Sequence, residues 1–127
     1  MNRLPVFVAA AAAAGVLVLG GCSKAAPPVS FAKDVQPILK ARCGSCHVPG
    51  QPGYEASGLS VESYDSLMKG TKYGPVVIPG DALSSTLNTL VEGRADPSIR
   101  MPHGGTPLPE AEQKILHAWV AQGAKNN

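Results

Sequence analysis

The chain has 127 residues, 44% of them hydrophobic and 16% charged, and this length leaves room for a single domain. Its formal net charge is +2, and basic and acidic residues are interspersed along the chain without a run of one sign. This pattern argues against nucleic acid as a partner. There are three cysteines, Cys22, Cys43 and Cys46, and an odd number in an exported protein requires an explanation for the unpaired one.

Residues 1–21 predict a secretory signal, because Arg3 precedes an apolar stretch that ends in small residues before Cys22. Small residues directly before a cysteine resemble the bacterial lipobox, so we expect cleavage there and lipid on the sulfur and amine of Cys22. An uncleaved transmembrane anchor is the alternative, since the stretch approaches the roughly 20 residues that span a bilayer. Lipid on Cys22 would hold the protein on the periplasmic side of a bacterial membrane, and the sequence does not indicate which membrane.

Residues 22–29 (CSKAAPPV) are small, polar and proline-bearing, and they predict a tether to a domain that spans residues 30–127. Ser30 is expected to cap a first helix that runs into Cys43. Pro37 lies inside this helix and either kinks it or delays its start. The apolar residues of the helix recur at helical spacing: Phe31, Val35, Ile38 and Leu39.

The remaining elements are short. Residues 48–58 have the composition of a loop, and residues 59–68 predict a helix capped by Ser60 or Ser63 and ended by Gly70. Residues 72–80 are expected to be extended, and Asp81 to cap a helix ending near Val91. That helix is expected to turn four apolar residues inward: Leu83, Leu87, Leu90 and Val91.

Residues 94–107 are rich in Gly and Pro and are expected to be irregular. A last helix should begin at Pro109, with Glu110 and Glu112 at its positive end, and stop at Gly123. Its expected buried stripe is Ala111, Ile115, Ala118 and Trp119. The sequence thus predicts an all-α domain of about four short helices with long loops, which a cofactor would have to stabilise.

Cys43, Cys46 and His47 form a Cys-x-x-Cys-His run, the attachment signature of c-type haem. Residues three and four apart share a helix face, so the run can present two sulfurs to the haem vinyl groups and an imidazole to the iron. A thiol–disulfide redox motif would follow a strand in a βαβ pattern, and the preceding segment here has a helical pattern. A zinc site usually needs a second ligand pair, and a disulfide alone would not explain His47.

The candidates for the second axial ligand are Met68, Met101, His103 and His117. Met101 is favoured because an irregular loop can carry its thioether over the open haem face, and His103 is its rival. Met68 ends a predicted helix among apolar neighbours, which is typical of a core residue. His117 is interpreted as a surface or capping histidine.

From Phe31 to Ala124 the chain resembles bacterial class I cytochromes c, in particular the planctomycete-type domains. The resemblance implies that Cys43 and Cys46 form the thioethers, that His47 is the proximal ligand and that Met101 is the distal one. It also implies that the first and last helices cross, with Phe31 or Val35 near Trp119. His103 stands where relatives commonly have a second proline after Met-Pro, which keeps a bis-histidine iron open. The matching segments are FAKDVQPILKARCGSCH, GLSVESYDSLMKG, GPVVIPGD, MPHGG and PLPEAEQKILHAWVAQGA.

These patterns predict a class I cytochrome c fold around one covalent haem c, which carries single electrons between redox partner proteins and is not an enzyme. A haem-based sensor, from which Met101 would dissociate to admit a gas, is one alternative. An accessory haem subunit of a larger oxidoreductase is another.

Overall fold

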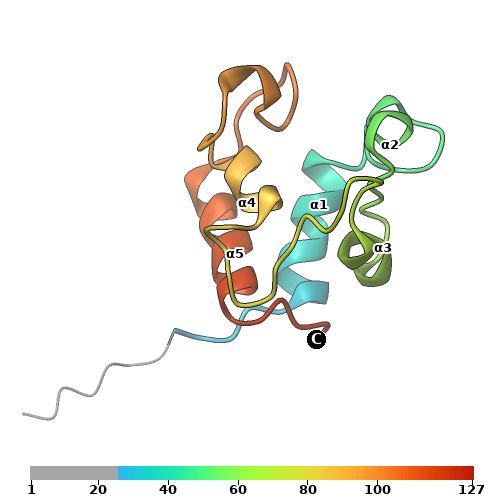
Figure 1. Ribbon diagram of the computed structural model, residues 1–127. Coiled ribbons are helices and arrows are strands. Elements are labelled where there is room, and N and C mark those ends of the chain that lie inside the picture. The colour runs from blue at the N-terminus through green and yellow to red at the C-terminus, as the bar shows by residue number, and fades with distance from the viewer. Residues whose placement is uncertain (1–25) are drawn as a thin grey trace, which may run out of the picture.

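The computed structural model describes residues 26–127, so the predicted signal, Cys22 and the first half of the predicted tether lie outside the described residues. Within this range the elements are all helical, as predicted, with no strand. Figure 1 shows them in chain order. They are the π-helix η1 (Phe31–Val35), α1 (Gln36–Arg42), α2 (Pro52–Ser57), α3 (Tyr64–Lys69), α4 (Thr86–Val91), the 3₁₀ turn η2 (Pro97–Ile99) and α5 (Glu110–Ala121).

The first helix begins as the sequence predicts. The Ser30 side chain accepts a hydrogen bond from the Lys33 amide and caps η1, and the regular α-helix starts only at Gln36, with Pro37 in its first turn. Proline has no amide hydrogen, so it fits where the first turn leaves amides unpaired. The helix ends at Arg42, directly before Cys43.

The first and last helices meet through a cluster of three aromatic side chains, which confirms the predicted crossing. The rings of Phe31 and Trp119 lie 5.5 Å apart, and Tyr64 from α3 packs edge-on against Phe31 at 5.2 Å. Trp119 is buried, and its indole N–H donates to the Lys125 carbonyl at 2.9 Å. Aromatic pairs of this geometry add to the stability that burial of their apolar surface provides.

The expected loop over residues 48–58 is wrong, because Pro52–Ser57 forms α2. Pro52 has its φ already fixed at a helical value, and Gly58 ends the helix with a φ of 78°, in the left-handed region that favours glycine. The helix over Tyr64–Lys69 is as predicted, with a capping box at Ser63 and its end at Gly70. Residues 72–80 are irregular, as expected.

The expected start of α4 at Asp81 is also wrong, because the helix begins at Thr86. The Asp81 carboxylate caps only a turn through the Ser84 amide, and the buried Ser85 hydroxyl donates to the Asp81 carbonyl and accepts from the Ile78 amide. Such side-chain bonds compete with helix formation. Leu83 therefore lies outside the helix and is 69% exposed, against the prediction that it faces inward.

The last helix begins at Glu110, with Pro109 as its N-cap, and its buried face differs from the predicted stripe. Ala111 is exposed and Ile115 only half-buried, whereas Leu116 and Val120 join Trp119 in the core. Among residues 26–127, no helix has both the length and the apolar character that crossing a bilayer requires.

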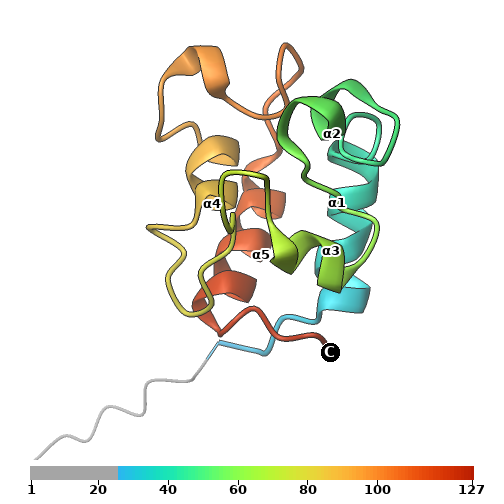
Figure 2. The same ribbon diagram turned by 45° about the vertical axis from the view of Figure 1, so that its right-hand side comes forward.

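The two ends of the molecule are formed by different segments of the chain. Figures 1 and 2 both place α2 and the irregular segment 94–108 at one end, and the C-terminus and the start of the described chain at the other. The core between them comes from every α-helix except α2 and from the segment around Val76 and Val77.

Candidate functional site

The Cys-x-x-Cys-His run follows directly on α1, and backbone hydrogen bonds join it to the end of that helix. The amides of Cys43 and Gly44 both donate to the Leu39 carbonyl, and the His47 amide donates to the Cys43 carbonyl at 2.9 Å. The last of these bonds joins residues four apart, as in a helical turn, although the run lies beyond the end of α1. The backbone leaves no room for a side chain at Gly44, because a Cβ there would lie 2.7 Å from the Lys40 carbonyl oxygen.

The two cysteines form no disulfide with each other. Cys43 packs partly buried against the hydrophobic core, and Cys46 is exposed. Burial raises the pKa of Cys43 to about 11, with further contributions from Cys46 and the Glu112 carboxylate. A redox-active Cys-x-x-Cys needs a cysteine with a lowered pKa, so this geometry disfavours the thiol–disulfide interpretation.

His47 is half-buried and lies against α2. Its Nδ1 atom is buried and has no hydrogen-bond partner among the described residues. Burial lowers the pKa of His47, and a hydrogen bond with the backbone of Leu59 opposes that effect. The ring is therefore neutral near pH 7, the form that ligates metals.

Gly53 is a residue of this site that the sequence alone did not single out. A Cβ at Gly53 would lie 2.8 Å from the Cys46 carbonyl oxygen and about 3.0 Å from His47 Cε1. The Tyr54 amide donates to the same Cys46 carbonyl. The first turn of α2 thus fixes both the backbone of the cysteine run and the imidazole, and the only sequence signal was a glycine beside a helix-starting proline.

Among residues 26–127, no three side chains of the His, Cys, Asp and Glu types converge as a bound metal ion requires. The two sulfurs and the imidazole of the run are therefore not arranged around one point, which disfavours a zinc site. A c-type haem needs the sulfurs and the imidazole at separate positions, because its vinyl groups lie at the ring edge and its iron at the ring centre.

Met101 lies in the irregular segment 94–108 and is partly buried against the core. Its amide donates to the Leu90 carbonyl at 3.2 Å, which fixes the segment to the end of α4. His103, its rival as a ligand, is exposed. Met68 packs against the core, and His117 is partly exposed with its Nδ1 2.9 Å from a Glu92 carboxylate oxygen.

Residues 43–104 match the family model of planctomycete cytochrome c. The match begins at Cys43, includes His47 and extends past Met101 and His103. This match supports a planctomycete-type cytochrome c domain in the chain. Among curated proteins, none matches the sequence significantly.

One solved structure to which the chain is similar is that of Kuenenia stuttgartiensis hydrazine synthase, at 23% sequence identity and a TM-score of 0.49. The similarity covers 76% of this chain and 16% of that one, so this chain spans about a sixth of the length of the other.

A cytochrome c domain implies covalently bound c-type haem, and the residues of the site fit this group. The two cysteine thiols are not joined to each other, and burial lowers the pKa of His47, which favours the neutral imidazole that can ligate iron. Cys43 and Cys46 would form the thioether bonds, and His47 would hold the iron from one side. These three assignments, and Met101 on the other side, remain predictions.

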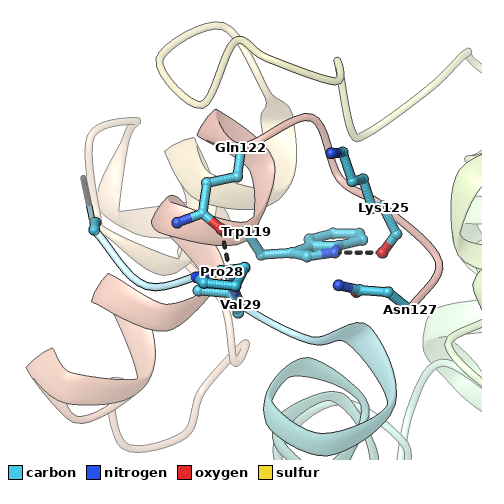
Figure 3. Close-up of a pocket in the computed structure, with 7 residues that line it drawn as sticks. Pro28, Val29, Trp119, Gln122, Lys125 and Asn127 are labelled. Atoms are coloured by element: carbon cyan, nitrogen blue, oxygen red, sulfur yellow. Dashed lines mark hydrogen bonds between the residues drawn. The ribbon is translucent and has the colours of Figure 1, made fainter.

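A pocket of about 300 Å³ lies at the other end of the molecule. Figure 3 shows it between the end of α5 and the start of the described chain, where Val29 donates its amide to the Gln122 side chain. None of the predicted haem-binding residues lines it. The residues around it are Ala26, Pro28, Val29, Trp119, Gln122, Lys125 and Asn127.

Proposed function

We propose that this cytochrome c domain binds one haem, carries single electrons between redox partner proteins and catalyses no reaction of its own. The observation that carries the proposal is the contrast between Met101, partly buried against the core, and the exposed His103 two residues later. A thioether already inside the fold can close the second face of an iron whose first face is held by His47.

The chain's own residues would hold and shield the group. Thioethers to Cys43 and Cys46 would prevent its loss, and the absence of a side chain at Gly53 leaves room for the His47 ring. When bound, haem supplies an iron that accepts and releases one electron, and methionine opposite histidine favours the reduced form. With protein ligands on both faces, no position is open to oxygen or peroxide, so outer-sphere electron transfer is the expected activity.

Replacement of the two candidate ligands tests the proposal. Met101→Ala should remove the methionine-to-iron absorption band, lower the midpoint potential and admit carbon monoxide, because the soft thioether is lost. His103→Ala is the matched control in the same segment and should do none of these. The reverse pattern would make the protein a bis-histidine cytochrome of lower potential.

We further propose that lipid on Cys22 tethers the domain to the periplasmic side of a bacterial membrane. The residues that support this are the apolar stretch and the small residues before Cys22. Cys22→Ser should release the protein into the soluble periplasmic fraction or block its processing. Unchanged processing and membrane attachment would instead indicate an uncleaved membrane helix.

A further inference from the structure

Arg100 directly precedes Met101, and the backbone amide of each residue donates a hydrogen bond that fixes its position. The Arg100 amide donates to the Pro97 carbonyl at 3.3 Å, and the Met101 amide to the Leu90 carbonyl at 3.2 Å. The Arg100 guanidinium lies against Gly93, where a Cβ would come within 2.9 Å of Cζ and 3.1 Å of Nε. Gly93 has a φ of 68°, in the region that favours glycine, so the sequence provides a residue without a side chain beside the guanidinium.

The Nε atom of Arg100 is buried and has no hydrogen-bond partner among residues 26–127. The other two arginines in this range are paired, Arg42 with Glu112 and Arg94 with Glu92. The acidic residue nearest in the sequence, Asp96, accepts hydrogen bonds at Oδ1 from the amide and hydroxyl of Ser98, and it forms no ion pair with Arg100.

A guanidinium stays charged at any physiological pH, so it cannot avoid the free-energy cost of burial by losing a proton. Leaving one of its N–H groups buried without an acceptor is unfavourable, because the group has given up its hydrogen bonds to water. The described part of the chain offers this N–H no acceptor. An acceptor from outside the polypeptide would remove the cost, and a carboxylate matches the fork of guanidinium donors best.

We propose that the Arg100 guanidinium binds a propionate carboxylate of the haem. The haem keeps two such carboxylates when its vinyl groups are consumed in thioethers to Cys43 and Cys46. This inference rests on the proposed haem site, because Arg100 adjoins the predicted ligand Met101. A cation held at a propionate cancels negative charge near the iron, which disfavours the ferric form and raises the midpoint potential.

The first test compares midpoint potentials of the haem-loaded protein. Arg100→Gln should lower the potential, and Arg100→Lys should lower it less because the charge remains while the fork of donors is lost. Gly93→Ala should also lower it, since the new Cβ displaces the guanidinium without changing the charge of the protein. The matched control is Lys69→Gln, which removes one exposed positive charge from α3 and should leave the potential nearly unchanged.

The second test uses the unmodified protein and does not depend on any variant folding. In the reduced, diamagnetic protein, the Arg100 Nε–H proton should show a nuclear Overhauser cross-peak to the methylene protons of a haem propionate, assigned by its absence in Arg100→Lys. A haem-loaded, methionine-ligated protein without this cross-peak would overturn the Arg100 assignment alone. So would an Arg100→Gln variant whose potential shifts no more than that of Lys69→Gln. A protein without covalent haem would overturn the proposed function as well.

Discussion

Replacing Gly53 by Ala should disturb the haem-attachment run from outside it. The new Cβ would lie 2.8 Å from the Cys46 carbonyl oxygen, 3.0 Å from His47 Cε1 and 3.1 Å from His47 Nδ1. The first of these contacts is to backbone, so the side chain cannot relieve it by rotating. Either α2 must move away from the run, or Cys46 and His47 must move together.

The expected cost follows from two opposing effects. Overpacking of a well-packed site costs about 1–3 kcal/mol, whereas alanine in place of glycine favours a helix by up to about 1 kcal/mol. We therefore expect a net loss of about 1–2 kcal/mol. In a domain of this size, each kcal/mol lowers the melting temperature by about 4–8 °C.

Thermal unfolding of the haem-loaded protein, followed in the visible spectrum, measures this effect together with the environment of the iron. The matched control is Gly105→Ala, whose new Cβ would have its closest contact at 3.4 Å, to Pro102, and which we expect to stay within about 0.5 kcal/mol of the unmodified protein. A Gly53→Ala protein that melts at a higher temperature with an unchanged spectrum would refute the reasoning, because helix propensity alone would then explain the result.

Two further predictions concern the fold around the site. Trp119→Phe keeps an aromatic ring against Phe31 and Tyr64 but leaves the Lys125 carbonyl without its donor. Urea unfolding should therefore show a loss of about 1–3 kcal/mol in the free energy of unfolding. An unchanged unfolding midpoint would contradict this. Burial raises the pKa of Glu92, but hydrogen bonds from His117 and Arg94 outweigh it and leave the pKa below its ordinary value. A carboxylate with a lowered pKa adds stability that is present at neutral pH and lost as the pH falls through that pKa. Glu92→Gln should therefore destabilise the protein at pH 7 and progressively less below about pH 4, and an equal effect at pH 7 and pH 3 would contradict this.

The elements that could be predicted from the sequence are those with local signals at both ends. Ser63 and Gly70 bracket α3, and both act as the caps that their residue types suggest. α2 was missed because Pro52 and Gly58 are helix-boundary residues that also dominate loops, and the six residues between the caps carry no buried apolar face. Composition alone cannot separate these two outcomes.

Two wrong predictions, the start of α4 and the buried face of α5, involve contacts that hydrophobic periodicity does not describe. The start of α4 shifted because Ser85 bonds to Ile78 and Asp81, and no periodic pattern encodes those contacts. In α5 the apolar residues outnumber those that one face can bury, so only the packing of the neighbouring helices selects Leu116 and Val120 over Ala111.

The candidate site divides in the same way. The residues expected to touch the iron or to form the thioethers could be predicted from the sequence because Cys-x-x-Cys-His and Met-Pro are contiguous motifs. Gly53 and Arg100 became visible only in the folded chain, since their roles depend on distances to residues elsewhere in the sequence. Single residues that support a site from another element carry no spacing signal that a sequence could reveal.

The central claim, an iron with both faces held by this chain, is tested most directly by the visible spectrum of the unmodified, reduced protein before and after addition of carbon monoxide. We expect the spectrum of a c-type haem that carbon monoxide leaves unchanged, because His47 and Met101 would occupy both axial positions under this proposal. A spectrum that shifts readily on addition of the gas would contradict the electron-carrier assignment and identify a ligand-binding haem protein instead.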